Sequence, residues 1–407
     1  MFFSYVPQDP LFYVPLSMNQ LQSADAAVIG GGIIGLATAY HLARRGRKVV
    51  LFERNTQAVG ASVRNFGLLW PIGQAPGPTY ARAVRSLEIW RELAGAAGFG
   101  LRENGSLHLA YAADEWAVLA EFAATAAGNG YQDCALLSPP AALDKSPGVR
   151  AAGLQGALWS PSEMTVDPRE AVAALPAYLA GKLGVTLRFG TAVNGIDFPS
   201  IHTKDERWRV AEVYVCGGAD FETLYPEVFA GLPLTKCKLQ MMRTAPQPGG
   251  WRLGPTLCGG LTLRHYAAFR HCPSLASLHE RVSHEQPWVD QWGIHVMVTQ
   301  NHLGELVIGD SHEYGPCPSP FDREEIDRLI LDYLATFAQV PDLRIAQRWH
   351  GVYPKPTNGA TELVLHPEPG VTIINGLGGA GMTLSFGLTE EVIAGTYVQP
   401  ADAAVVL

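Results

Sequence analysis

Residues 24–53 read ADAAVIGGGIIGLATAYHLARRGRKVVLFE, and this stretch decides the fold. An apolar run leads into the glycine turn 30–35, a helical segment follows, and a second apolar run ends at Glu53. The turn has the GxGxxG spacing: the first glycine permits a tight turn, the second lets the backbone approach a pyrophosphate, and the third lets helix and strand pack closely. A helix that begins there presents N–H groups to the pyrophosphate, and Glu53 can accept hydrogen bonds from a ribose. The stretch therefore predicts a βαβ unit that binds a dinucleotide, either NAD or FAD.

Bulk composition narrows the class of protein. The chain has 407 residues, 47% of them hydrophobic and 17% charged, which is enough for two or more globular domains. The net charge is -8 and no dense basic run occurs, so nucleic acid is not expected as the main partner. The 6 cysteines form no CxxC pair and have no zinc-ligand spacing. We expect reduced thiols, no metal site and no disulfide-reductase chemistry.

Residues 1–23 are expected to form an N-terminal extension. They contain Pro7, Pro10 and Pro15 but no lysine or arginine, which argues against a signal peptide. Met18 is a possible natural start, and residues 1–17 are predicted to be dispensable. No long apolar run without glycine breaks occurs, so we expect no membrane span and a cytoplasmic location.

Periodicity predicts the remaining elements. Asp167 and Pro168 have the residue types of an N-cap and of the first helical position. Further helices are predicted over 80–97, 114–128 and 322–337, and strands over 185–189, 212–215, 232–243, 261–269, 295–299, 305–309 and 371–375. The strands between 232 and 309 are expected to form a separate antiparallel sheet.

Two more stretches carry a resemblance to a known family. They read GASVRNFG at 60–67 and GLGGAGMT at 376–383. Together with the glycine turn they resemble the D-amino-acid oxidase superfamily, which includes glycine oxidase and sarcosine oxidase, over nearly the whole chain from Ala24 to Gly395. The resemblance implies FAD as cofactor, with the first stretch along its pyrophosphate and flavin. The second turn is implied to aim a helix at the flavin's pyrimidine edge, where reduction places negative charge.

This resemblance implies a set of FAD-binding residues. The predicted contacts are Gly30, Gly32, Ile33, Ile34, Gly35, Glu53, Arg54, Ala61, Ser62, Arg64, Asn65, Phe66, Gly67, Val193, Gly217, Gly218, Gly378, Gly379, Gly381, Met382 and Thr383. Sarcosine oxidases attach flavin through a cysteine in the segment that corresponds to 349–354. That segment has no cysteine here, so we expect noncovalent FAD.

The expected fold class is α/β plus α+β, with a Rossmann-like FAD-binding domain interleaved with a substrate domain built on an antiparallel sheet. The FAD-binding domain is predicted to comprise residues 24–78, 161–231 and 341–407. The substrate domain is predicted to comprise residues 79–160 and 232–340.

Within the superfamily, ASVRNFGLLWPIGQAPG (61–77) and GGLTLRHYAAF (259–269) resemble a subgroup associated with aminophosphonate breakdown. This implies oxidation of 2-aminoethylphosphonate or its N-methyl derivative by oxygen, giving an aldehyde, ammonia or methylamine, and hydrogen peroxide. A glycine, sarcosine or D-amino-acid oxidase is the nearest alternative. A flavin-dependent dehydrogenase with another electron acceptor and a non-catalytic FAD-binding protein also stay open, as does the oligomeric state.

Amine oxidation depends mainly on orienting a neutral amine and anchoring its anionic end, so cations and aromatic residues are the candidates. The predicted catalytic residues are Arg64, His265, Tyr266, His350, Tyr353 and Lys355. Three of them have a plainer interpretation: Arg64 as a flavin contact, His265 as a structural residue and Lys355 as a solvated loop lysine. Strand alternation would place His265 opposite Arg264 and Tyr266.

Other polar and aromatic residues have weaker roles. Trp70 is expected in the core, and Gln74 is a candidate for the pocket. Lys238 could assist oxygen reduction, although a surface strand lysine is the expected outcome. Finally, Arg344, Arg348, His350 and Lys355 are predicted to form a cationic cluster that favours a phosphonate over a carboxylate.

Overall fold

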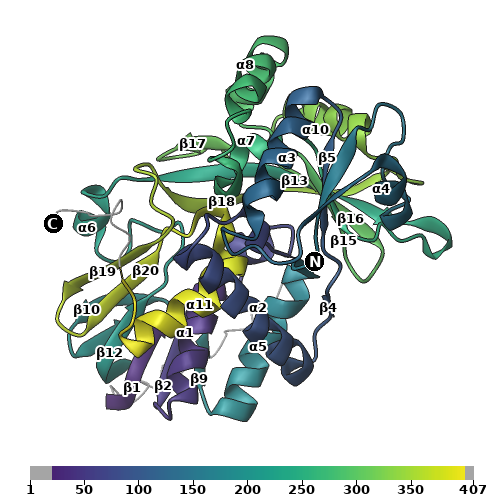
Figure 1. The fold of residues 1–407 in the computed structure, drawn as a ribbon. Helices are drawn as coiled ribbons and strands as arrows, with labels where there is room; N and C mark the ends of the chain where they lie inside the picture. Colours follow the sequence, from purple (N-terminus) through teal and green to yellow (C-terminus); the bar gives the residue numbers. More distant parts are fainter. Residues whose placement is uncertain (1–20, 399–407) are drawn as a thin grey trace, which may run out of the picture.

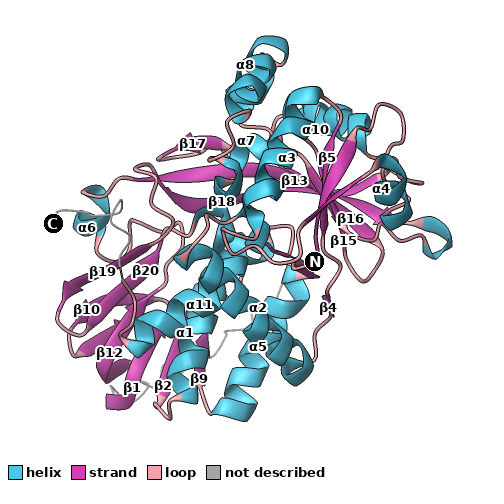
Figure 2. Cartoon of the chain, viewed as in Figure 1, coloured by secondary structure: helices cyan, strands magenta, loops and turns pink. Residues whose placement is uncertain are grey.

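A computed structural model describes residues 21–398 (Figure 1). The prediction that residues 1–17 are dispensable lies outside the described residues. Two lobes are visible, each with its own sheet, and helices cover the sheets (Figure 2). No helix within residues 21–398 is long and apolar enough to cross a membrane.

The first lobe is built on a sheet whose central strands are parallel. Its strands are β1 (Leu21–Ile29), β2 (Val49–Glu53), β9 (Thr186–Phe189), β10 (Val193–Asp197), β11 (Ser200–Thr203), β12 (Arg207–Val215), β19 (Leu363–Glu368) and β20 (Val371–Asn375). Strands β9, β2, β1, β12 and β20 lie side by side in parallel. The predicted βαβ unit is confirmed, since α1 (Ile33–Arg44) connects β1 to its parallel neighbour β2.

Four helices cover one face of this sheet. Besides α1 they are α2 (Pro78–Ala97), α5 (Pro168–Leu183) and α11 (Gly381–Ala394), which pack against one another (Figure 1). Helix α5 begins as the sequence predicts, because Asp167 accepts a hydrogen bond from the Arg169 N–H and Pro168 occupies the first turn. The buried apolar faces of these helices and of β1 and β2 form one continuous core.

The second lobe is built on a larger sheet. Its strands are β5 (Ser106–Ala110), β6 (Ala135–Leu137), β7 (Gly156–Ser160), β13 (Leu234–Pro246), β14 (Thr256–Cys258), β15 (Met297–Gln300), β16 (Glu305–Gly309), β17 (Glu313–Gly315) and β18 (Ile345–Pro356). The helices of this lobe are α3 (Ala113–Ala126), α4 (Pro139–Lys145), α7 (Thr262–His265), α8 (Leu275–Glu285), α9 (Pro287–Trp292) and α10 (Glu324–Phe337). A small sheet of β3 (Leu68–Leu69), β8 (Met164–Val166) and β4 (Leu101–Arg102) and the short helix α6 (Pro226–Ala230) complete the described chain.

The large sheet differs from the prediction in two respects. It is mixed rather than purely antiparallel, because β5 and β14 pair in parallel. In addition, β18 pairs with β13 along most of its length, so residues 345–356 belong to this sheet. The predicted boundary at residue 341 therefore separates β18 from the sheet that contains it.

The predicted strand over residues 261–269 is wrong. Strand β14 ends at Cys258, and the chain then forms α7 and the short helical turn η4 (Ala267–Phe269). The Thr262 hydroxyl donates to the Gly259 carbonyl at 2.7 Å, and the Thr262 N–H donates to the same oxygen at 3.0 Å. Such local bonds favour a turn over a strand ladder. The alternation argument for His265 therefore does not apply.

A buried ion-pair network joins α2, α11 and the segment before β19. Arg82 donates to Glu362 at 2.8 Å and to Glu391 at 2.8 Å. The side chains of Arg82 and Glu362 are only 3% and 0% exposed. Because both charges are out of water, the loss of one leaves the other uncompensated.

We predict that Arg82→Ala lowers the free energy of unfolding by about 3–5 kcal/mol, the range for breaking a buried ion pair. The measurement is the thermal or urea midpoint of the FAD-loaded protein. Arg85 is the matched control: it lies on the same helix and pairs with Glu390 at the surface, so Arg85→Ala should cost about 0–1 kcal/mol. Equal effects of the two substitutions would contradict the assigned role of the network.

Candidate active site

A cavity of about 850 Å³ lies where the two lobes meet. The first lobe contributes the start of α1, the short helical turn η1 (Ala61–Val63), residues 216–220 and the turn 376–381. The second lobe contributes parts of β13, β18, α7, β15 and the residues after β16. The volume is within the range of about 300–1,000 Å³ typical of small-molecule and cofactor sites.

The glycine turn brings three backbone segments together more closely than side chains would allow. Gly30 has φ +110°, and a Cβ there would lie 2.3 Å from the Cys216 carbonyl oxygen. A Cβ on Gly35 would lie 1.9 Å from the Gly30 carbonyl oxygen. These two glycines thus allow strand, turn and helix to pack as the fingerprint requires. Gly32 is the N-cap of α1 and lines the cavity.

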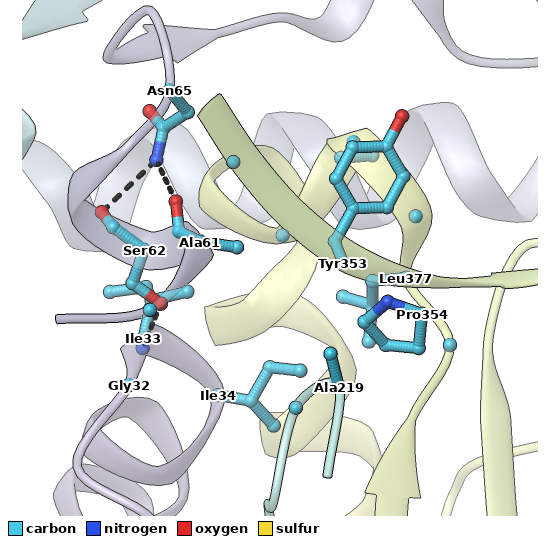
Figure 3. Close-up of a pocket in the computed structure, with 18 of the residues that line it drawn as sticks. Gly32, Ile33, Ile34, Ala61, Ser62, Asn65, Ala219, Tyr353, Pro354 and Leu377 are labelled. Atoms are coloured by element: carbon cyan, nitrogen blue, oxygen red, sulfur yellow. Dashed lines mark hydrogen bonds between the residues drawn. The ribbon is translucent and has the colours of Figure 1, made fainter. Parts of the chain in front are cut away.

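Side chains from two other segments fix the start of α1. The Ile33 N–H donates to Ser62 Oγ at 2.9 Å, and the Gly31 N–H donates to Glu53 Oε2 at 2.8 Å. Asn65 in turn donates to the Ala61 and Ser62 carbonyls at 2.9 and 3.0 Å, which stabilises the 61–65 turn that presents Ser62 to α1 (Figure 3). The positive end of α1 therefore opens onto the cavity, where it favours an anionic ligand.

A second helix also begins at the cavity. The turn before α11 has positive φ at Gly376 and Gly378, and a Cβ on Gly381 would lie 3.7 Å from the Ile33 side chain. The N-termini of α1 and α11 are therefore neighbours on one wall. Thr383 Oγ1 accepts a hydrogen bond from the Trp70 N–H at 2.9 Å, which ties α11 to the segment that follows η1.

Most residues predicted to bind FAD converge on this cavity. Gly35 and Gly67 are the exceptions, since both pack against backbone elsewhere: a Cβ on Gly67 would lie 2.0 Å from the Val166 carbonyl. The predicted residues that line the cavity are Gly30, Gly32, Ile33, Ile34, Glu53, Arg54, Ala61, Ser62, Arg64, Asn65, Phe66, Val193, Gly217, Gly218, Gly378, Gly379, Gly381, Met382 and Thr383. Their individual contacts to the cofactor stay predictions.

The predicted catalytic residues are brought together with one exception. Arg64, His265, Tyr266, Tyr353 and Lys355 line the cavity. His350 does not: its Nδ1 pairs with Asp322 at 2.8 Å, and its carbonyl accepts a hydrogen bond from Arg64. His350 is separated from Tyr353 by an odd number of positions on β18, so the two side chains point to opposite faces.

The predicted cationic cluster before the last strand is wrong. Arg344 pairs with Asp342 at 2.6 Å, and Arg348 pairs with Asp327 at 2.8 Å. Because β18 is extended, these residues are spread along it rather than gathered at one point. Of the four proposed members, only Lys355 lines the cavity.

Lys238 also differs from expectation. Its side chain is buried rather than on the surface, and its ammonium lies 3.0 Å from Asp322. Its neighbours on β13, Leu239 and Met241, line the cavity, so alternation directs Lys238 to the other face. A role in oxygen reduction is therefore not supported. Trp70 and Gln74 are both buried, and both line the cavity.

Four polar residues that the second lobe contributes to the cavity were missed by sequence reasoning: Arg270, His295, Asp310 and His312. Antiparallel pairing of β15 and β16 brings His295 opposite Asp310, where their backbones exchange hydrogen bonds of 3.3 and 2.9 Å. His265 reaches the same place from α7, with its ring centroid 3.9 Å from that of His295. Nothing in the local sequence signals this meeting, because it depends on strand register and on a turn predicted as a strand.

Burial keeps most of these groups neutral. Desolvation, together with the neighbouring imidazoles, lowers the pKa of His265 and His295 well below the usual value. Burial also lowers the pKa of His312 to about 4. The pKa of Asp310 is raised well above its usual value by burial, and that of Lys355 is lowered by burial. His265 lines the cavity and is exposed.

Several buried polar atoms here lack a partner. Within residues 21–398, both ring nitrogens of His295, Asp310 Oδ1 and Trp70 Nε1 have no hydrogen bond. Because buried polar groups are nearly always satisfied, such a cluster in a cavity wall indicates a polar ligand. The glycine turns line another part of the cavity, and Lys355 is close both to the second turn and to His265 and His312. The cavity thus has one end suited to a dinucleotide and one suited to a small polar substrate.

The family described as DAO, FAD dependent oxidoreductase, has a sequence model that matches residues 25–394. The chain belongs to this family. It is therefore an enzyme, and its cofactor is FAD.

The curated relatives that match this chain include oxidases of amino compounds. A glycine oxidase from Geobacillus kaustophilus (strain HTA426) is 31% identical over 55% of this chain and 62% of the relative. A D-amino-acid oxidase from Streptomyces coelicolor (strain ATCC BAA-471 / A3(2) / M145) is 42% identical over 20% of this chain and 26% of the relative. The chain spans less than two thirds of the length of these two relatives. A glycine oxidase from Bacillus licheniformis is 24% identical over 84% of this chain and 85% of the relative.

Solved structures support the fold. The glycine oxidase from Geobacillus kaustophilus superposes with a TM-score of 0.73 at 24% identity, covering 92% of this chain and 94% of that one. The L-proline dehydrogenase from P. horikoshii superposes with a TM-score of 0.74 at 21% identity, covering 94% and 96%. The mixed α/β architecture is therefore that of the glycine oxidase type.

The residues present fit FAD, and they fit noncovalent binding. The paired helix N-termini and the glycine cradle suit a diphosphate and a flavin edge. Among the cavity-lining residues of the described chain, Cys216 is the only cysteine. Burial raises the pKa of Cys216 to about 12, so it carries almost no nucleophilic thiolate.

We predict that Gly32→Val abolishes FAD retention. A Cβ at Gly32 would already lie 3.0 Å from Ser62 Oγ, and the larger side chain would extend into the space in front of the α1 N–H groups. The measurement is the flavin-to-protein absorbance ratio after gel filtration, with circular dichroism to verify folding. Gly181→Val is the control, since a Cβ there meets nothing within 4 Å. A folded Gly32→Val protein with full FAD content would contradict the fingerprint.

Proposed function

We propose that the protein is an FAD-dependent oxidase of small amines that carry an anionic group. The observation that carries this proposal is Lys355, a half-buried cation that reaches the cavity beside the second glycine turn. A Cβ on Gly378 would lie 3.4 Å from Lys355 Nζ, so the ammonium lies over that turn. A desolvated lysine at this position suits the anionic end of a substrate.

The cavity walls explain how an amine would be positioned. Leu239, Met241 and Met297 provide an apolar lining that excludes water. Tyr266 and Tyr353 add aromatic walls, and desolvation raises the pKa of both hydroxyls well above the usual value. Bound FAD supplies the hydride acceptor for the amine's C–H bond, and oxygen is the proposed final oxidant.

The names of the relatives support amino compounds as substrates. Glycine oxidases and a D-amino-acid oxidase match this chain, and so does the mitochondrial sarcosine dehydrogenase of Homo sapiens, at 31% identity over 36% of the chain. All of these names indicate small amino acids, so an aminocarboxylate is the nearest substrate class. The dehydrogenase match keeps a second electron acceptor as an outcome of the oxygen assay below.

A finer proposal is that the amine is 2-aminoethylphosphonate or its N-methyl derivative. The stretches 61–77 and 259–269 support it through their resemblance to the aminophosphonate-linked subgroup. The second stretch includes His265 and Tyr266, which line the cavity. A phosphonate offers up to two charges and three acceptor oxygens, and it therefore gains more than a carboxylate from several donors.

We predict a higher kcat/KM for 2-aminoethylphosphonate or its N-methyl derivative than for glycine, sarcosine or D-alanine. The measurement is oxygen consumption with this panel, repeated with an artificial electron acceptor. A higher kcat/KM for glycine or sarcosine would mean that the preferred substrate carries a carboxylate rather than a phosphonate. Turnover only with the artificial acceptor would make the protein a dehydrogenase.

Lys355→Ala is predicted to raise KM for the anionic amine about tenfold or more, because a charged hydrogen bond contributes roughly 1.5–3 kcal/mol. A neutral amine should be little affected. Since burial lowers the pKa of Lys355, its charge is lost as pH rises through that lowered value, and KM for the anionic amine should rise there. Lys182→Ala, on the exposed side of α5, is the control. Unchanged KM in Lys355→Ala would remove Lys355 from the anion site.

A further inference from the structure

Three histidines form one group at the substrate end of the cavity. His265 comes from α7, His295 precedes β15, and His312 follows β16. One nitrogen from each ring can be chosen so that all three lie within 4.8 Å of one another. The ring centroids of His295 and His312 are 5.0 Å apart with the planes inclined by 21°, and those of His265 and His312 are 4.8 Å apart. We call these three residues the histidine cluster.

The hydrogen bonding of His312 determines what its free nitrogen can do. Its Nδ1 lies 2.9 Å from the Gly293 carbonyl oxygen. A carbonyl can only accept, so Nδ1 carries a proton. In the neutral ring, Nε2 is then an acceptor, and it can donate to an anion only after the ring takes up a second proton.

Asp310 in the same way determines what the free ring nitrogens of His295 can do. Its Nε2 lies 3.4 Å from Asp310 Oδ1, and neither atom has another partner in the described chain. A carboxyl group at this distance can stabilise an imidazolium once a proton arrives. Burial favours the protonated form of Asp310 by raising its pKa, so its carboxyl adds no negative charge that would repel a bound anion.

Cationic and titratable groups from several elements surround the cluster. Lys355 and Tyr353 face it from β18, Arg270 and Tyr266 from the segment around η4, and Asp310 from the end of β16. Cys237 on β13 and Tyr314 on β17 are the nearest further titratable groups, and burial raises the pKa of both. Without a ligand the three imidazoles are neutral near pH 7, because burial and the neighbouring cations oppose their protonation.

We propose that the histidine cluster, together with Lys355, is a receptor for a tetrahedral oxyanion with two negative charges, and that binding of this anion is coupled to uptake of a proton by the cluster. The link to phosphonate substrates rests on the proposed function. The receptor itself rests on the convergence of three imidazoles, a lysine and an arginine at one end of the cavity.

The number of negative charges on the ligand determines whether its binding draws a proton onto the histidine cluster. A dianion is attracted to Lys355 strongly enough to draw a proton onto a neighbouring imidazole, which supplies a second cation and a new N–H donor. A carboxylate, with one charge, is already balanced by Lys355 and has less reason to recruit a proton.

The test uses the FAD-loaded protein and methylphosphonate, which has no amine and cannot be oxidised. Isothermal titration at pH 9, where free methylphosphonate is already a dianion, in buffers of different ionisation enthalpy measures the protons that the protein takes up per anion bound. We expect uptake on binding of methylphosphonate, at least tenfold weaker binding of acetate, and no uptake with acetate. Because the bound cluster has raised pKa values, the affinity for methylphosphonate should fall as pH rises through them.

Two variants locate the effect. His265 faces the open cavity, so His265→Gln should fold normally, bind methylphosphonate at least tenfold more weakly and take up less than half of the wild-type number of protons. His312→Gln should also lower the number of protons taken up per methylphosphonate bound. His366→Gln is the control, because His366 is exposed on β19 in the other lobe and should leave both quantities unchanged. FAD content and melting temperature verify each protein.

Three results would overturn the proposal: methylphosphonate binding without proton uptake, equal affinity in wild type and His265→Gln, or a stoichiometric zinc ion in the purified protein that His265→Gln loses. These outcomes are separate from those of the proposed function. Binding with proton uptake but no turnover of aminophosphonates would leave the receptor in place and remove the substrate assignment. Turnover of aminophosphonates without proton uptake would support the substrate assignment and remove the proton-coupled receptor.

Discussion

The close approach of backbone to backbone at Gly30 and Gly35 is the constraint on which the rest of the site depends. The carbonyl of Cys216 lies where a side chain on Gly30 would be, and the carbonyl of Gly30 lies where a side chain on Gly35 would be. This packing sets the start of α1 at the edge of the sheet, where its N–H groups open onto the cavity. Since α11 begins beside Ile33, the same contact brings two helix N-termini to one wall.

The second lobe determines what this wall can act on. Strands β13 and β18 pair over most of their length and extend toward the first lobe (Figure 1). Leu239 and Met241 thereby line the cavity, and Tyr353 and Lys355 lie beside the second glycine turn. Alternation along these strands separates two sets of charges. Lys355 reaches the cavity, whereas Lys238 is buried in ion pairs on the other face of β13. The selection of cations at the site is therefore a matter of strand register.

The buried polar groups beside the substrate space are costly to keep. His295 and Asp310 have no hydrogen-bond partner for their free atoms in the described chain, and an unsatisfied buried polar group costs about 1–3 kcal/mol. A protein keeps such groups where a ligand completes them. The same physical argument applies to both parts of the cavity. The glycine turns suit the FAD cofactor, and the unsatisfied polar groups beside the histidine cluster suit the substrate that the cofactor oxidises.

The sequence by itself determined the βαβ unit, the cofactor class and many of the cavity-lining residues of the first lobe. It could do so because the glycine turn and the stretches at 60–67 and 376–383 are local patterns, in which a few consecutive residues define the backbone. Only the tertiary structure decided which cations and histidines meet. Residues 261–269 form a turn rather than a strand, Arg344, Arg348 and His350 point away, and His295, Asp310 and His312 enter the site. These placements depend on the register between strands distant in the sequence, and a one-residue shift in register reverses the face of every side chain.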